Sequence, residues 1–335
     1  MFLVPPGFTA ALTGVRRLSG AGVVEADHQR GACVHDGQID PGVRASVMAL
    51  IGPDGRLVPW AIGALAMLAI VAFAGNSLLT RAALAGDLIG PAEFGQIRLA
   101  SGAVALVIFA LASGRAALPR RADLPGGLAL AIYTAGFSFA YVRLDAGSGA
   151  LILFAAVSAT VVLASLRSGI QWVELAGLAL ALTGLVWLLL PGAGRVDLLP
   201  AGLMAAAGIA WGGYTLIGRQ GGEPVGRTAR SFVLASLFLL PALLIGSTTA
   251  STPAGITIAI VCGVVTSAAG YSVWYLCLPR LPVIASGSVQ LATPAVAALG
   301  GIVFLGEPMT GRLVLAGLLI LAGVGVTLLR PPSKK

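Results

Sequence analysis

Charged side chains are scarce in this sequence. Only 10% of the 335 residues are Asp, Glu, Lys or Arg, whereas 57% are hydrophobic. An ordinary soluble domain has about 25% charged residues, because it must cover its surface with polar groups. The alternation of polar and apolar residues that a membrane β-barrel needs is also absent. The composition therefore predicts an all-α integral membrane protein.

Lysine and histidine are almost missing, which removes several kinds of site. The only lysines are Lys334 and Lys335, so no phosphate-binding loop with its lysine exists, and an ATP-driven pump would need a partner ATPase. Both histidines, His28 and His35, precede the apolar region, and three cysteines give no zinc spacing. We therefore expect no metal, no cofactor and no catalytic residue.

Residues 1–56 differ from the rest in being polar, Gly-rich and aperiodic. We expect a disordered cytoplasmic tail; the alternative is that translation starts at Met48. Within residues 1–58 five Arg are balanced by five acids, so the net charge of +8 comes from the connections between apolar stretches. That placement indicates membrane orientation and contact with anionic lipid, and it argues against nucleic acid as a partner.

From Leu57 onward, charged residues separate apolar stretches of the length that crosses a bilayer as a helix. The second stretch starts near Phe94, so Arg98 either snorkels to the interface or faces the bundle. We expect about ten transmembrane helices in two halves, residues 57–194 and 195–330, followed by a cytoplasmic tail at 331–335. The stretches are 57–80, 99–114, 124–142, 146–166, 175–194, 198–218, two within 231–279 that the polar run 246–255 divides, 281–306 and 313–329.

The placement of Arg and Lys predicts the orientation. If the N-terminus is cytoplasmic, eleven basic residues fall in inner connections and four or five in outer ones. This is the positive-inside bias. We therefore expect a multi-pass protein of the cell inner (plasma) membrane with both termini in the cytoplasm.

The two halves share short patterns at nearly one offset. The segment Phe73–Arg81 resembles Trp211–Arg219, 138 residues later, and Ala176–Gly184 resembles Leu315–Gly323, 139 residues later. Five spans per half is an odd number, so the second half would enter the membrane upside down relative to the first. Secondary transporters with such inverted repeats bind substrate between the repeats. The alternative is a chance likeness between Gly/Ala/Leu-rich spans.

Several motifs occur in order within this duplicated frame: Ala74-Gly-Asn-Ser77, Arg98, Tyr275-Leu-Cys-Leu-Pro-Arg-Leu-Pro282, Leu291-Ala-Thr-Pro294, and Leu305-Gly-Glu-Pro308 followed by Ala316–Gly323. On these residues, positions 60–330 resemble the EamA-type transporters of the drug/metabolite transporter (DMT) superfamily. The resemblance implies a ten-helix inverted-repeat fold and the transport, commonly the export, of small metabolites such as amino acids. Where the family has Gly-Glu after the fourth span, this sequence has Arg167-Ser168, which puts a role for paired glutamates in doubt.

Polar and aromatic residues inside the spans are the candidates for substrate binding, because buried polarity is costly without a partner. For Asn76 the alternative is an interhelical hydrogen bond. Tyr271, Trp274 and Tyr275 share one helix face; we expect Trp274 and Tyr275 in the aromatic belt at the lipid interface, and Tyr271 with Tyr133 at a cavity. The candidates are Asn76, Tyr133, Tyr214, Tyr271, Gln290 and Thr293.

Three further positions have two interpretations each. Pro294 predicts a helix kink whose freed carbonyl could bind a solute, or a kink that serves packing alone. Glu307 could act in proton coupling or gating, or it could begin a helix just before Pro308, where a carboxylate meets the positive end of the dipole. The spacing Gly208-x-x-x-Gly212 permits close helix contact and predicts packing.

Together these features predict a secondary transporter, an exporter of small metabolites such as amino acids or related solutes, that works by alternating access between the two halves. The alternatives are a non-transporting receptor or scaffold, and a membrane-embedded enzyme, for which the sequence has neither G-x-S-x-G nor H-E-x-x-H. The expected partners are a small-molecule substrate and the lipid bilayer. The sequence does not indicate an oligomeric state.

Overall fold

The computed structural model describes residues 59–165, 172–189, 197–219, 223–245, 249–281 and 289–328. The predicted tails at 1–56 and 331–335 and the Arg167-Ser168 departure lie outside these ranges. Of the chain's two units, the second, Leu65–Lys335, contains all of the described helices except the first residues of α3.

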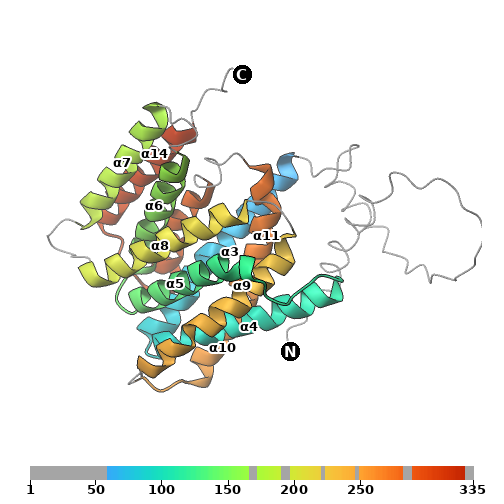
Figure 1. Cartoon of the computed structure of the whole chain (residues 1–335). Coiled ribbons are helices and arrows are strands. Elements are labelled where there is room, and N and C mark those ends of the chain that lie inside the picture. Colours follow the sequence, from blue (N-terminus) through green and yellow to red (C-terminus); the bar gives the residue numbers. More distant parts are fainter. Residues whose placement is uncertain are drawn as a thin grey trace, which may run out of the picture. The chain divides into compact units, whose positions relative to one another are not determined.

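Within the described ranges the chain is helical and contains no strand (Figure 1). The first half of the sequence forms α3 (Pro59–Ala85), α4 (Pro91–Ala112), the 3-10 turn η1 (Arg121–Asp123), α5 (Leu124–Tyr141), α6 (Ala146–Ser165) and α7 (Trp172–Leu189). The second half forms α8 (Leu198–Gly218), α9 (Pro224–Leu239), η3 (Leu240–Ile245), α10 (Pro253–Val261), the π-helix η4 (Cys262–Ala269), α11 (Gly270–Cys277), η5 (Leu278–Arg280), η6 (Val289–Leu291), α13 (Ala292–Leu305) and α14 (Gly311–Leu328).

Seven helices in the described ranges are long and apolar enough to cross a membrane. They span 60–85, 91–112, 121–141, 146–164, 198–218, 224–244 and 253–280, and two shorter apolar helices cover 292–305 and 311–323. Large apolar side chains such as Ile108, Leu244 and Phe304 are exposed on them, as lipid contact requires and water does not favour. Within the described ranges the structure confirms the all-α prediction, and its helices have the length and composition of a multi-pass membrane protein; the count of ten spans stays a prediction.

Helix pairs that are distant in sequence carry the packing. Helix α8 packs against α5 and α6, α9 packs against α4 and α5, and α14 packs against α7 (Figure 1). Glycine permits the α6–α8 contact: a Cβ on Gly208 would collide with the Leu153 carbonyl oxygen, and one on Gly212 would lie 2.8 Å from Thr160 Cβ. The packing predicted for the Gly208-x-x-x-Gly212 spacing is therefore confirmed.

The connections gather at two ends of the bundle. At the first, the Arg81 end, Arg143 pairs with Asp197 at 3.4 Å and Thr252 donates to the Leu88 carbonyl at 2.8 Å. At the second, the Arg115 end, Arg115 pairs with Glu223 at 3.0 Å, and Arg230 pairs with Asp123 at 2.8 Å. The Arg81 end comprises 81–91, 141–146, 197, 249–253 and 306–311, and the Arg115 end comprises 112–124, 219–224 and 278–281.

Thr252 joins two connections at the Arg81 end. Its hydroxyl accepts from the Gly255 amide at 3.1 Å, which caps α10, and donates to the Leu88 carbonyl. We expect Thr252→Ala to lower the free energy of unfolding by about 1 kcal/mol, the usual cost of losing an N-cap. Thermal unfolding in detergent, followed by tryptophan fluorescence, measures it. The control is Thr257→Ala, whose exposed hydroxyl, among the described residues, donates only to the Pro253 carbonyl of its own helix. Equal losses would contradict the capping role.

Candidate functional site: a buried aromatic chamber around Arg98

Arg98 lies inside the bundle with 1% of its surface exposed. Its Nε donates to Ser267 Oγ at 2.9 Å, and its Nη2 donates to the hydroxyls of Tyr271 at 2.9 Å and Tyr133 at 3.2 Å. Its Cζ lies 5.2 Å from the ring centre of Tyr133 and 5.1 Å from that of Phe137, within cation–π range. Of the two interpretations of Arg98, the one that faces it into the bundle is therefore correct.

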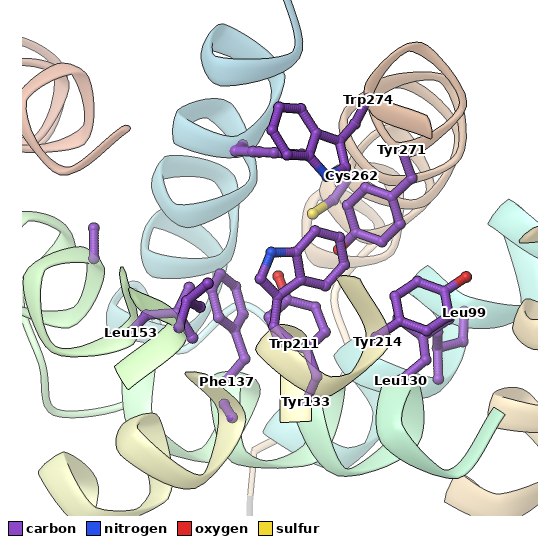
Figure 2. Packing of buried hydrophobic residues seen from close by; sticks show 14 of the residues in the cluster. Leu99, Leu130, Tyr133, Phe137, Leu153, Trp211, Tyr214, Cys262, Tyr271 and Trp274 are labelled. Carbon is purple, nitrogen blue, oxygen red and sulfur yellow. The ribbon is translucent and has the colours of Figure 1, made fainter. Parts of the chain in front are cut away.

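Trp211 on α8 is the centre of a cluster of aromatic rings. Its ring centre lies 4.6 Å from Tyr271, 5.1 Å from Tyr133 and 5.6 Å from Phe73. Figure 2 shows the Trp211 indole between the rings of Tyr133 and Tyr271. Helices α3, α5, α8 and α11 each contribute to this cluster, so it joins the two halves of the sequence.

A small cavity lies within this cluster, with room for about one water molecule. Its walls are aromatic and apolar, with two phenol hydroxyls and one serine as polar groups. A solute larger than water therefore enters only if side chains or helices move. The lining residues are Phe73, Ser77, Tyr133, Phe137, Leu153, Phe154, Trp211 and Tyr271.

Asn76 forms a polar connection beside the cavity. Its Nδ2 donates to the Tyr133 hydroxyl at 3.0 Å, and its Oδ1 accepts from Cys262 Sγ at 2.8 Å. The hydroxyls of Thr266 and Ser267 lie 3.4 Å from the same oxygen. These bonds tie α3 to α5 and to the π-helix η4, so the interhelical hydrogen bond weighed for Asn76 is present.

We expect Asn76→Ala to lower the free energy of unfolding by about 2 kcal/mol, because a buried acceptor on α5 and buried donors on η4 lose their partner. Ser272→Ala is the control, since its hydroxyl donates to the Ala268 carbonyl one turn earlier in the same continuous span, 253–280, and to no other group in the described ranges. Thermal unfolding in detergent distinguishes the two. A loss for Asn76→Ala no larger than the control's would show that this connection does not hold the helices together.

Three more of the predicted residues lie in η6 and at the start of α13. Gln290 is buried, and its Oε1 accepts from Trp211 Nε1 at 2.8 Å. Thr293 is buried as well. Pro294 lies in the first turn of α13, directly after η6, where a missing N–H costs no bond within that helix. The kink predicted at Pro294 stays a prediction, because residues 282–288, which precede η6, lie outside the described ranges.

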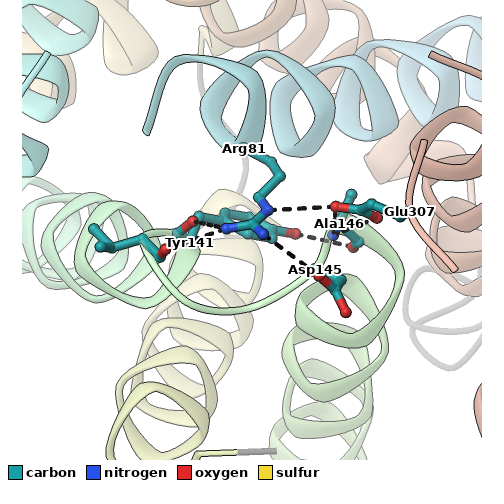
Figure 3. A network of polar contacts seen from close by, with 6 residues as sticks. Arg81, Tyr141, Asp145, Ala146 and Glu307 are labelled. Atoms are coloured by element: carbon teal, nitrogen blue, oxygen red, sulfur yellow. Dashed lines mark hydrogen bonds and ion pairs between the residues drawn. The ribbon is translucent and has the colours of Figure 1, made fainter. Parts of the chain in front are cut away.

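At the Arg81 end, two carboxylates and two backbone carbonyls surround one arginine (Figure 3). Arg81 Nε lies 3.3 Å from Glu307 Oε1 and its Nη2 lies 3.4 Å from Asp145 Oδ1. Its Nη1 donates to the carbonyls of Tyr141 and Val142 at the end of α5, at 3.1 and 3.2 Å. These contacts of Arg81 join α3 and α5–α6 of the first half to the α13–α14 connection of the second.

Comparisons with known proteins place this architecture. An uncharacterized protein of Pseudomonas aeruginosa, PA1977, is 46% identical over 267 residues, which cover 79% of this chain and 93% of that protein. The sequence profile of the EamA-like transporter family matches residues 198–329. The chain belongs to the EamA-like transporter family.

Two further relatives of this EamA-like protein have transport in their names. The threonine/homoserine exporter RhtA of Escherichia coli K12 is 34% identical over 177 residues, 48% of this chain and 57% of RhtA. The uncharacterized transporter YwfM of Bacillus subtilis is 30% identical over 162 residues, 47% of this chain and 54% of YwfM. The chain thus matches little more than half the length of each. A solved crystal structure shares the fold, with a TM-score of 0.63 and 17% identity over 80% of this chain and 96% of that one.

Two predictions about this EamA-like transporter are wrong. Trp274 and Tyr275 are 0% and 3% exposed, so they do not form a belt at the lipid interface. They lie near the end of their span, as predicted, but they point inward. Trp274 packs on Phe73 at 5.8 Å and Tyr275 packs on Tyr214 at 5.5 Å, which gives these rings protein neighbours in place of lipid.

The second wrong prediction places Glu307 at the start of the following helix. That helix, α14, begins at Gly311, and the Glu307 carboxylate instead accepts from the Ala146 amide at 2.9 and 3.0 Å. Gly306 takes a left-handed φ of +66°, which lets the chain turn back toward α6. The carboxylate therefore meets the positive end of a helix dipole, but it is the dipole of α6.

Of the predicted residues, Tyr133 and Tyr271 line the cavity, and Asn76 and Gln290 bond to lining residues. Tyr214 packs on Trp211 at 5.7 Å, behind the lining. Sequence reasoning missed four lining aromatic residues. Trp211 and Phe73 head the two repeated segments, so their matched positions were a usable signal. Phe137 and Phe154 sit in apolar runs that offer none.

Proposed function

We propose that this chain is a secondary transporter, an exporter of small metabolites such as amino acids, that works by alternating access between two inverted five-helix halves, 57–194 and 195–330. The family supports transport, and the name of the threonine/homoserine exporter RhtA supports amino acids as the substrate class. Ten spans with both termini in the cytoplasm place the Arg81 end outside and the Arg115 end inside.

The observation that carries this proposal is a nearly filled cavity between the halves with ion pairs across both ends. At the Arg81 end, Arg81 pairs with Glu307; at the Arg115 end, Asp123 pairs with Arg230. Each pair joins one half to the other. A transporter closed on both sides needs this arrangement, and opening then requires the pairs at one end to break while those at the other hold.

Equivalent contacts in the two halves support the inverted repeat. Arg81 lies about one turn before the end of the first helix of its half and donates to the carbonyls of Tyr141 and Val142 at the end of the third. Arg219, its counterpart 138 residues later, donates to the carbonyls of Leu278 and Leu281 at the end of the third helix of its half, at 3.3 and 3.1 Å. An inversion puts these two matched contacts at opposite ends of the bundle.

We place the substrate at the chamber, in contact with Tyr133 and Tyr271, with Asn76, Tyr214, Gln290 and Thr293 supporting its walls. Glu307 acts as a gate at the Arg81 end. Burial raises the pKa of its carboxyl, and Asp145 acts in the same direction, while the Ala146 amide and Arg81 oppose them. Opening at this end changes the burial of the carboxyl and its contacts with Arg81 and Ala146, so its pKa changes between the closed and open states, which makes Glu307 the coupling candidate.

Exchange of labelled solutes in proteoliposomes tests transport. The panel comprises neutral amino acids, organic acids, nucleosides and polyamines, with empty liposomes as the blank. We expect at least one solute to exchange, Gln290→Ala to slow that exchange, and Thr257→Ala, on an exposed face, to leave it unchanged. A receptor, scaffold or enzyme would exchange nothing, and that result would refute the proposal.

Accessibility labelling tests the topology separately. Cysteines introduced at the exposed positions Arg120 and Arg280 should react only with reagent on the cytoplasmic side, and one at Arg143 only with reagent outside. Labelling of positions 120 and 280 from opposite sides would rule out the inverted repeat, because that topology puts both connections on the cytoplasmic side.

A further inference from the structure

Within the described part of the chain, the positive charge of Arg98 has no acidic partner. None of the ion pairs in the described ranges includes it, although its side chain is buried. Its three hydrogen bonds go to the neutral hydroxyls of Ser267, Tyr133 and Tyr271. Hydroxyls satisfy N–H groups but supply no negative charge. An unpaired cation inside a membrane bundle is expensive, and such a residue usually marks a binding or transport path.

Part of the guanidinium is also left unused. Arg98 Nη1 is buried and has no hydrogen-bond partner within the described part of the chain. The Tyr133 hydroxyl already accepts two N–H groups, from Arg98 and from Asn76. This corner of the chamber therefore has more donors than acceptors. What it lacks is an anionic acceptor.

Arg98 lies directly behind the cavity wall. It contacts Tyr133, Phe137 and Tyr271, which are three of the eight lining residues. Apart from Ser77 the remaining wall is aromatic or aliphatic, and no lining residue is acidic. A movement of either phenol would bring an acceptor in the cavity within reach of the guanidinium. A carboxylate suits it, because arginine binds the two oxygens through parallel N–H groups.

We propose that Arg98 is the anchor for the substrate's carboxylate, with the aromatic rings around Trp211 holding an uncharged remainder. This inference rests on the proposed function and narrows its substrate class. The substrate is a small molecule that carries a carboxylate, zwitterionic or anionic. Solutes that carry only positive charge are excluded, because the lining offers them no acid.

Competition on the wild-type protein tests the anchor without any mutation. Counterflow of labelled L-threonine and L-phenylalanine is measured against unlabelled L-threonine, L-threoninamide, L-phenylalanine, L-phenylalaninamide and putrescine. We expect each amide to inhibit about 10- to 100-fold more weakly than its acid, the range for one lost hydrogen-bonded charge contact. Putrescine should not inhibit. Equal inhibition by acid and amide, or exchange only of solutes without an anionic group, overturns the anchor while leaving transport intact.

Two variants separate binding from a structural role. Arg98→Gln should reduce the ratio of acid to amide inhibition to about one, and Arg98→Lys, which keeps the charge, should retain most of it. Arg143→Gln, at a site where 71% of the side chain is exposed, should keep the full ratio. A merely structural Arg98 would lower every flux and leave the ratio unchanged, which would refute the anchor. Absence of exchange for the whole panel in wild type would refute the proposed function and the anchor with it.

Discussion

Gly208→Ala is expected to destabilise the protein by about 3 kcal/mol, at the upper end of the range for overpacking. The added methyl group would collide with the Leu153 carbonyl oxygen and lie 2.7 Å from Ala156 Cβ. Both neighbours belong to α6, and a backbone carbonyl cannot rotate away as a side chain can. Helices α6 and α8 must therefore separate. Because they belong to different halves, the chamber between the halves changes shape too.

Gly202→Ala on the same helix is the matched control. A methyl group there meets nothing within 4 Å, and alanine is favoured over glycine in a helix by about 1 kcal/mol. Unfolding in detergent, followed by tryptophan fluorescence, should show Gly202→Ala at or above the wild-type stability and Gly208→Ala well below it. If both variants unfold together, the close approach of α6 to α8 does not determine stability.

The helices could be predicted from the sequence because lipid leaves the backbone few options. Charges bound most of the apolar stretches, and the polar run 246–255 divides the two spans within 231–279. The direction in which each helix face points was harder to predict. Helix α4 is apolar nearly all round, so no stripe shows which way Arg98 points, and its direction depends on hydroxyls 35 to 173 residues away.

The predictions that failed depend on contacts between distant segments. Depth in the span is readable for Trp274 and Tyr275, but the rotation of α11 is not, and it turns them onto Phe73 and Tyr214. For Glu307 the local sequence favoured a helix start. The carboxylate instead binds the Ala146 amide, which lies 161 residues earlier in the sequence. The left-handed turn at Gly306 brings the two groups together, and nothing in the neighbouring sequence predicts that turn.

Arg81→Gln is expected to cost about 3 kcal/mol at pH 8, since it removes one partner of a largely buried pair. Glu307 has 10% of its side chain exposed, and Asp145 lies nearby as a second negative charge. Arg81 is the cation that opposes the burial-raised pKa of Glu307. Without it that pKa rises further. The variant then relieves its uncompensated charge by binding a proton.

The sign of the pH dependence follows from this proton. A carboxyl whose pKa is raised in the folded state contributes full stability below its unfolded pKa and loses that contribution as pH rises through the raised value. The deficit of Arg81→Gln relative to wild type should therefore be largest at pH 8 and shrink toward pH 5.

Arg81→Gln combined with Glu307→Gln should recover most of the loss at pH 8. Arg143→Gln, which breaks an exposed pair at the same end, should cost less than about 1 kcal/mol at either pH. A deficit that does not change with pH, or that the double variant fails to relieve, would show that Glu307 is not the group that Arg81 stabilises.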